Sequence, residues 1–181
     1  MIVSPVKDNM LVIDNYLNSE EHKLIKETLL GDFPWYYNDY KVGDEAIDDK
    51  YNYQLIHMFY NDYTITSQYW QTILPIIKKL NPAAIVRVKA NLNPNTDNPN
   101  VFAFHTDTNI RFKGKTAVYY VNTNNGYTIF KNGKEVESVE NRIVIFDNNE
   151  LHTNSTCTDK KVRCVLNFNY IEQERDVDNN D

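Results

Sequence analysis

The sequence is short of several residue types and patterns, and each shortage excludes a class of protein. No stretch approaches the roughly 18 consecutive apolar residues of a membrane-spanning helix, and the first residues lack the charged and apolar regions of a signal peptide. Only two cysteines occur, Cys157 and Cys164, and we expect free thiols rather than a disulfide. The expected location is therefore cytoplasmic, with no membrane partner.

Positive charge is also scarce. The 19 lysines and arginines are outnumbered by 25 aspartates and glutamates, which leaves a formal net charge of -6. An acidic chain offers no electrostatic footprint for a phosphate backbone, so nucleic acid is an unfavourable partner. The 181 residues, 41% of them hydrophobic, suffice for one domain with one core. Oligomeric state is not readable from these features.

Helical patterns are confined to the first half of the chain. Asn18 or Ser19 is placed to cap a helix that Gly31 ends. Ser67 is placed to cap a second helix, in which apolar residues repeat at helical spacing up to about residue 80. Between these helices, residues 51–60 alternate in the manner of a strand.

From residue 85 the pattern changes to short β-rich runs separated by turn residues. We expect eight strands, at residues 85–92, 102–107, 116–122, 127–131, 134–138, 142–146, 150–153 and 162–170. The pair Asn132-Gly133 is the strongest hairpin signal. Two helices before eight strands predict an α+β fold in which the strands form a two-sheet jelly roll. The single domain 1–181 then has an N-terminal helical and strand buttress (1–84), a jelly-roll core (85–170) and a frayed tail (171–181).

His105-Thr106-Asp107 is the first chemical signal in the chain. Residues i and i+2 of a strand project from one face, so the imidazole and the carboxylate are expected to point into the same space. His152, which follows an apolar strand pattern, is the candidate for a third ligand. Two histidines and one carboxylate suit iron(II) and leave positions open for other ligands. A His-x-Asp pair also arises by chance, and its plainer interpretation is a histidine hydrogen-bonded to a neighbouring carboxylate.

Arg163 opens the last expected strand, about ten residues after His152. The planar guanidinium matches a carboxylate bidentately and stays charged when buried. Asn167 shares a strand face with Arg163 and is a candidate to add a hydrogen bond beside it. The alternative is an ordinary surface arginine.

The order His105-x-Asp107, His152, Arg163 over eight short strands resembles the iron(II)/2-oxoglutarate-dependent oxygenases of the double-stranded β-helix fold. Within that family it looks most like the prolyl-4-hydroxylase-like branch and its phage relatives. The resemblance covers about residues 85–170. It implies a dioxygenase that uses iron(II), O2 and 2-oxoglutarate, releases succinate and CO2, and hydroxylates a C–H bond of a peptide or small-molecule substrate.

The resemblance also implies roles for individual residues. His105, Asp107 and His152 are expected to be the catalytic metal ligands, and Arg163 the anchor for the 5-carboxylate of 2-oxoglutarate. Residues 126–130 (GYTIF) are similar to the Gly-x-Thr-x-Phe run on the fourth strand of these enzymes.

The chain departs from prolyl hydroxylases at two points. They usually hold the distal carboxylate with lysine, whereas this chain offers Arg163, as other branches do. They also carry a tyrosine on the first core strand, where Asn91 and Asn93 stand here as candidate hydrogen-bond donors to 2-oxoglutarate. Tyr119 or Tyr120 on the third strand is a candidate to replace that tyrosine. These departures weaken the inference of a prolyl substrate more than that of the chemistry.

Two other functions use the same residues. A zinc hydrolase needs a general base beside its water, for which Glu150 is the only nearby candidate, and it gives Arg163 no purpose. A cupin-like jelly-roll binding module keeps the metal without turnover.

The remaining histidines and the loops have structural interpretations. His57 is expected to be a packed, hydrogen-bonded residue, and His22 a solvated one on the first helix. The aromatic residues 33–40 are expected to pack at the core and rim, with a substrate lid as the alternative. The acidic residues 43–50 are expected to form a solvated loop.

Overall fold

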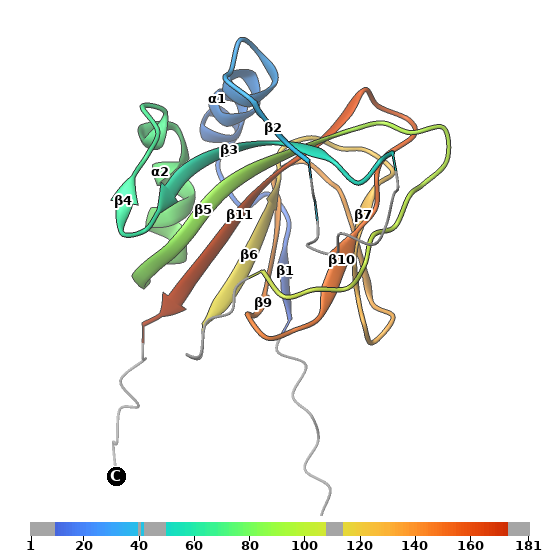
Figure 1. Ribbon diagram of the computed structural model, residues 1–181. Helices are drawn as coiled ribbons and strands as arrows, with labels where there is room; N and C mark the ends of the chain where they lie inside the picture. The colour runs from blue at the N-terminus through green and yellow to red at the C-terminus, as the bar shows by residue number, and fades with distance from the viewer. Residues whose placement is uncertain (1–9, 40, 42–49, 108–113, 174–181) are drawn as a thin grey trace, which may run out of the picture.

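The computed structural model describes residues 10–39, 41, 50–107 and 114–173. Within them the chain forms two helices and a set of strands whose pairings are all antiparallel (Figure 1). In chain order the elements are β1 (Leu11–Ile13), α1 (Ser19–Leu30), β2 (Tyr36–Asn38), β3 (Gln54–Asn61), β4 (Thr64–Ile65), α2 (Trp70–Leu80), β5 (Pro82–Pro94), β6 (Lys115–Tyr120), β7 (Tyr127–Phe130), β8 (Glu135–Glu137), β9 (Arg142–Asp147), β10 (His152–Asn154) and β11 (Val162–Glu172).

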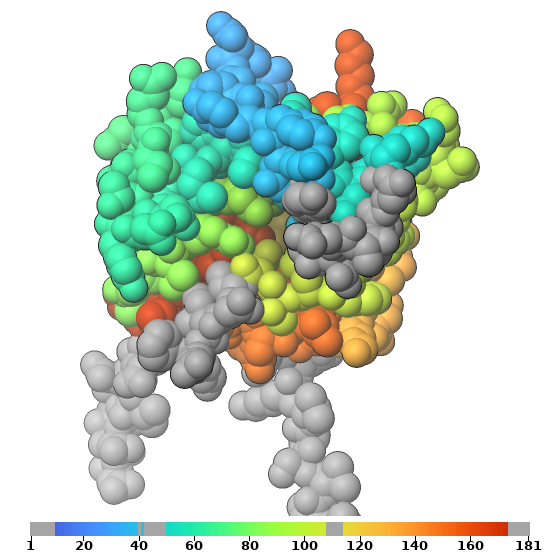
Figure 2. Space-filling view, viewed as in Figure 1, coloured from blue at the N-terminus to red at the C-terminus, as the bar shows by residue number. Residues whose placement is uncertain are grey.

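The strands form two sheets of unequal size. The large sheet has the order β1-β9-β6-β11-β5-β3-β2, with β4 paired to β3, and the small sheet has the order β10-β7-β8. In Figure 1 the helices lie on one side of the large sheet, and β7 and β10 lie on its other side. Figure 2 shows the surface of the molecule from the same direction. Residues from the first part of the chain (blue to cyan) form its upper part, and residues from the C-terminal half (yellow to orange) form its lower part. This arrangement has the two-sheet, helix-buttressed architecture that the sequence predicts.

β6, β9 and β11 divide their side chains between two cores, because successive residues point to opposite faces. On β6, Ala117 and Tyr119 pack with the helices, whereas Val118 and Tyr120 pack against the small sheet. On β11, Leu166 lies in the helix-side core. The functional side chains lie on the second face, between the sheets.

Local sequence signals account for the ends of α1 and for one hairpin. The Asn18 side chain caps α1 by accepting a hydrogen bond from the Glu21 backbone N–H at 2.9 Å, and Gly31 follows the helix, as predicted. β7 and β8 form the hairpin predicted at Asn132-Gly133, where Gly133 has a φ of +86°. Ser67 was expected to cap α2, and this is wrong. The helix begins after Tyr69 without a side-chain cap, and the Ser67 hydroxyl instead accepts from the Tyr69 N–H.

Seven of the eight expected core strands are present within a few residues of the predicted bounds. The prediction of a strand at 102–107 is wrong. Residues 102–107 form no strand. The pairing here consists of two isolated bridges, Val101–Ser155 and His105–His152, with a 3.4 Å hydrogen bond from the Phe102 N–H to the Asn154 carbonyl between them. These bridges are four residues apart on one side and three on the other, so one extra residue prevents a continuous ladder.

The N-terminal elements join the core directly. β3 pairs with β5, and β1 pairs with β9, so the residues before 85 extend the large sheet as well as covering it. β11 continues to Glu172, into the segment expected to fray. Most of that tail (174–181) and most of the acidic loop (42–49) lie outside the described residues. Among the helices that are described, neither is long and apolar enough to cross a membrane.

Candidate metal and co-substrate site

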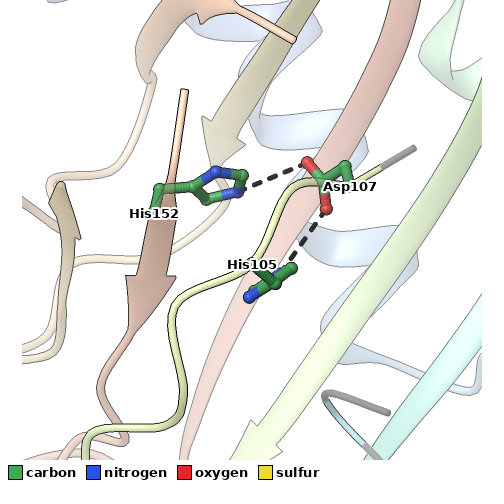
Figure 3. A group of neighbouring side chains, drawn as sticks. All are labelled: His105, Asp107 and His152. Atoms are coloured by element: carbon green, nitrogen blue, oxygen red, sulfur yellow. Dashed lines mark ion pairs between the residues drawn. The ribbon is translucent and has the colours of Figure 1, made fainter. Parts of the chain in front are cut away.

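Three side chains converge between the two sheets, as Figure 3 shows. The Nε2 atom of His105 lies 3.8 Å from one carboxylate oxygen of Asp107, and Nε2 of His152 lies 3.4 Å from the other. The ligand atoms of all three residues lie within 4.8 Å of one another. We call this group the metal triad, since two imidazoles and one carboxylate at this spacing can bind a single ion.

The metal triad is held by backbone pairing and not by one strand face, which corrects the prediction for the His-x-Asp motif. His152 begins β10, while His105 lies outside the strands. The two histidines exchange both backbone hydrogen bonds, at 2.9 and 3.0 Å, and their ring centroids are 5.0 Å apart. The chain turn after His105 then brings Asp107 to the same point. The bridge therefore fixes the two histidines relative to each other, while Asp107 is held by hydrogen bonds from Asn167 and Arg87.

Nδ1 of each imidazole is already hydrogen-bonded to a backbone carbonyl. Nδ1 of His105 lies 3.2 Å from the Ala103 carbonyl oxygen, and Nδ1 of His152 lies 3.0 Å from the Glu150 carbonyl oxygen. A carbonyl only accepts, so each Nδ1 must donate, and Nε2 of the neutral ring keeps its lone pair for a metal. This is the tautomer that a metal site requires.

Asp107 is positioned as an anion. Its side chain is 8% exposed, and one of its oxygens accepts a 2.8 Å hydrogen bond from the Asn167 amide. Burial raises the pKa of Asp107, but the hydrogen bond and charge of His152, the Asn167 amide and the charge of Arg87 outweigh burial and lower the pKa below its usual range. Burial likewise lowers the pKa of His152, and the same bond to Asp107 reverses the shift. The main charge that acts on Asp107 here is that of protonated His152, whose Nε2–H faces the carboxylate. A metal ion bound by Nε2 and the carboxylate would take the place of that proton, which fits Asp107 as a metal ligand.

The metal triad lines a cavity between the two sheets that is partly open to solvent. The cavity is lined by both sheets and the adjoining loops, through Lys41, Gln54, Lys89, Asn91, His105, Asp107, Val118, Thr128, His152, Thr153, Asn154, Arg163, Val165 and Asn167. Within the described part of the chain, the buried amide oxygens of Asn91, Asn154 and Asn167 have no hydrogen-bond partner. The lining is thus built for a polar ligand.

Arg163 lies at the far end of this cavity from the metal triad. It is four residues from Asn167 on β11, about 13 Å along the strand, and Asn167 is the residue that contacts Asp107. The Arg163 side chain is 1% exposed, so the surface interpretation is wrong. Its guanidinium donates from Nε to Ser138 Oγ at 2.9 Å and from Nη2 to Thr128 Oγ1 at 3.1 Å. Among the described residues it forms no ion pair, and an unpaired buried cation is costly.

Comparison with known proteins bears on the fold. No protein-family model and no curated protein sequence matches the chain. Among solved structures, an oxidoreductase of the 2OG-Fe(II) oxygenase family from Burkholderia pseudomallei is similar with a TM-score of 0.68 and 11% identity, over 93% of this chain and 87% of that one. A Trichoplax adhaerens prolyl hydroxylase, in complex with a hypoxia inducible factor peptide fragment, has a TM-score of 0.61 and 12% identity (91% and 84% covered). The non-heme alpha ketoglutarate dependent epimerase SnoN from nogalamycin biosynthesis has a TM-score of 0.57 and 12% identity (91% and 78% covered).

The chain has the double-stranded β-helix fold of these oxygenases. It also carries the His-x-Asp…His metal triad that the resemblance predicts. Within the double-stranded β-helix, the metal triad and Arg163 line one cavity.

Only some of the other residues predicted to contact the co-substrate line the cavity. Asn91 and Asn167 line the cavity, although the Asn167 amide is committed to Asp107. Asn93 is buried beside Arg163 in the β5–β11 register but does not line the cavity. The prediction that Tyr119 contacts 2-oxoglutarate is wrong. Its side chain faces the helices, where the hydroxyl hydrogen-bonds to His22 and Asn141.

The alternative tyrosine lies on the correct face of the double-stranded β-helix. The Tyr120 ring lies 5.7 Å from the Arg163 guanidinium carbon, and its hydroxyl donates to Thr128 Oγ1 at 2.8 Å. Thr128 thus holds both Tyr120 and Arg163. The Gly-x-Thr-x-Phe run carries the signal for Thr128, whereas nothing in the sequence singles out Ser138.

The two remaining histidines serve packing. His57 is buried, with hydrogen bonds at 2.7 Å to the Pro34 carbonyl and to Ser67 Oγ, which confirms its structural assignment. His22 was expected to be solvated, and this is wrong. Its side chain is buried under α1, and its Nδ1 lies 2.7 Å from the Tyr119 hydroxyl.

Proposed function

We propose that this protein is a non-haem iron(II), 2-oxoglutarate-dependent oxygenase that hydroxylates a C–H bond of a peptide or small-molecule substrate. The observation that carries the proposal is one cavity lined by the metal triad and by Arg163, a buried cation that lacks an acidic partner among the described residues. One end of the cavity suits a dication, and the other suits a carboxylate. 2-Oxoglutarate, which can chelate a metal and presents a second carboxylate, meets both requirements.

With iron(II), 2-oxoglutarate and oxygen bound, the site would supply the oxidation and release succinate and CO2. The chain's own residues do the positioning. The metal triad holds the ion, and Asn167 fixes one carboxylate oxygen of Asp107. Ser138 and Thr128 orient the Arg163 fork toward a distal carboxylate. Shielding by the two sheets strengthens that charge pair, since Coulomb interactions are weakly screened away from water.

The zinc-hydrolase alternative loses its general base. The Glu150 side chain does not line the cavity, and its carbonyl oxygen accepts from Nδ1 of His152. Nor would a hydrolase of this kind use a buried Arg163. The binding-module alternative differs from the proposal only in turnover, so an assay of turnover decides between them.

Hydroxylation is the outcome that we propose, and product analysis is its test. The fold is shared by a prolyl hydroxylase and by an epimerase, so the fold does not choose between these outcomes. Incorporation of an oxygen atom into the substrate, seen as a mass increase, supports hydroxylation. An unchanged substrate mass with inverted stereochemistry would contradict it.

The binding step has a separate test. Anaerobic protein with iron(II) and 2-oxoglutarate should show a weak visible charge-transfer band, which requires both groups on one centre. Protein loaded with zinc instead of iron gives no such band and serves as the control. Iron-loaded protein that binds no 2-oxoglutarate and shows no band would contradict the proposal and return the zinc hydrolase to consideration.

A further inference from the structure

Lys89 is a cavity residue that metal and 2-oxoglutarate binding do not explain. It lies in the middle of β5, where Val88 and Ala90 pack in the helix-side core and Lys89 and Asn91 line the cavity. In the β5–β11 register Lys89 is opposite Asn167, the residue that contacts Asp107. The Lys89 ammonium therefore belongs to the metal end of the cavity and not to the Arg163 end.

Positive charges outnumber negative ones among the described residues that line the cavity. Among the described residues that line it, Lys41, Lys89 and Arg163 are cationic, and Asp107 is the only acid. Iron(II) and 2-oxoglutarate would bring opposite charges of equal size and cancel in sum. Arg163 and Asp107 likewise cancel. Of the two remaining lysines, Lys41 has its ammonium 3.6 Å from the centre of the Phe102 ring, and Lys89 is left as a positive charge next to the site of oxidation.

The surroundings of Lys89 raise the cost of this excess charge. Burial lowers the pKa of Lys89 to about 8, and the nearby charge of Arg87 adds to this shift. The charge of Asp107 acts in the opposite direction and raises the pKa. The ammonium is still mostly charged at neutral pH. It forms no ion pair among the described residues, and Arg87 is already bonded to the Asp107 carbonyl at 2.8 Å and to Asn169 at 3.1 Å. A half-buried cation in this setting is stabilised by an anion from outside the chain.

We propose that Lys89 binds an anionic group, a carboxylate or a phosphate, on the primary substrate, so that this oxygenase acts on an acidic molecule or an acidic peptide side chain. The inference rests on the proposed function, because it assumes that iron and 2-oxoglutarate occupy the remainder of the cavity. Asn91, two residues along the same face, presents an amide beside the ammonium. An anion held there lies next to the metal triad, which places a neighbouring C–H bond within reach of the oxidation.

The test uses two matched pairs of small probes on the anaerobic protein loaded with iron(II) and saturating 2-oxoglutarate. N-acetylglycine is compared with the neutral N-acetylglycinamide, and glycerol 3-phosphate with glycerol. Binding is read from the change in the charge-transfer band and by calorimetry, neither of which needs turnover. The first pair reports on carboxylate and the second on phosphate. Saturation with 2-oxoglutarate keeps the probes away from the Arg163 end.

Three variants separate a charge contact from other effects. We expect the wild-type protein to prefer at least one anionic probe over its neutral partner by about tenfold, the size of one partly shielded charge pair. Lys89→Met should remove the preference, and Lys89→Arg should retain most of it. Lys78→Met removes the same charge from the exposed surface of α2 and should leave the preference unchanged.

Several results would overturn the inference. Equal binding of acid and neutral probes, or no binding of either acid, would show that Lys89 does not recognise an anion. A preference that survives in Lys89→Met would assign it to another residue. If Lys89→Met weakens 2-oxoglutarate itself as much as loss of Arg163 does, Lys89 is a co-substrate anchor. A wild-type protein without a 2-oxoglutarate band would instead overturn the proposed function, and the inference with it.

Discussion

Replacement of Arg163 by leucine should selectively weaken 2-oxoglutarate. The guanidinium is 1% exposed and is oriented by Ser138 and Thr128. Its remaining N–H groups have no partner among the described residues, so in our account they meet the 5-carboxylate. Arg163→Leu leaves that carboxylate buried and unpaired at the far end of the cavity.

The magnitude follows from the burial of both charges. Truncation of one partner of a buried, hydrogen-bonded charge pair costs about 2–5 kcal/mol. At roughly 1.4 kcal/mol per tenfold, the dissociation constant of 2-oxoglutarate should rise by about thirty-fold to several thousand-fold. Arg163→Lys should fall between leucine and wild type, because it keeps the charge and loses the fork. Iron affinity should change little, since Arg163 lies about 13 Å along β11 from the residue that contacts Asp107.

The assay is an anaerobic titration of the charge-transfer band with 2-oxoglutarate, together with iron content and a thermal melt for each variant. Arg142→Leu is the matched control, because Arg142 pairs with Asp14 away from the cavity. It should leave 2-oxoglutarate affinity unchanged. If Arg163→Leu is folded, holds iron and binds 2-oxoglutarate as tightly as wild type, the anchor is elsewhere and the reasoning is refuted.

Three further predictions concern the metal triad and its surroundings. Asp107→Ala and His152→Ala should each abolish turnover and reduce bound iron while the circular dichroism spectrum stays native; full iron stoichiometry with normal turnover would remove that residue from the ligand set. Gly126→Ala places a Cβ 2.8 Å from Cδ of Arg163, so it should displace the side chain, weaken 2-oxoglutarate and lower stability by about 1–3 kcal/mol in denaturant titration; unchanged affinity would show that the arginine tolerates the shift. His57→Gln should cost about 1–3 kcal/mol of stability through its two buried hydrogen bonds but retain turnover per folded molecule; loss of turnover in folded protein would give His57 a functional role.

The identity of the site residues was predictable because their order along the chain carries the information. His105, Asp107, His152 and Arg163 were predicted together, and all four line one cavity. The backbone pairing that positions them was less predictable. The bridge between His105 and His152 depends on a one-residue offset between two chain segments, which no local pattern of side chains records.

Which side a residue faces was the weakest part of the prediction. Tyr119 and Tyr120 are adjacent, and a shift of one residue in strand parity exchanges their environments. Tyr119 contacts His22 in the helix-side core, whereas Tyr120 lies near Arg163. His22 is three residues before Ile25 on α1, so it continues the buried stripe of that helix despite its acidic neighbours.

The position of Lys89 beside the metal triad follows from the sheet register and not from the sequence pattern alone. The alternation of β5 puts Lys89 and Asn91 on one face, but the sequence does not say which face lies beside the metal triad. Pairing of Lys89 with Asn167, and the bond from Asn167 to Asp107, settle that question. A lysine that reads as an ordinary strand residue thereby becomes part of the cavity.

The most direct test of the central claim is succinate formation from 2-oxoglutarate under oxygen by the iron-loaded protein, measured against a no-protein control. Our account predicts iron- and oxygen-dependent succinate above the control, slow without the primary substrate, and none from zinc-loaded protein or from Asp107→Ala. Protein shown to hold both iron and 2-oxoglutarate that forms no succinate above the control, either alone or with acidic candidate substrates, would contradict the account and identify a metal-binding module without turnover.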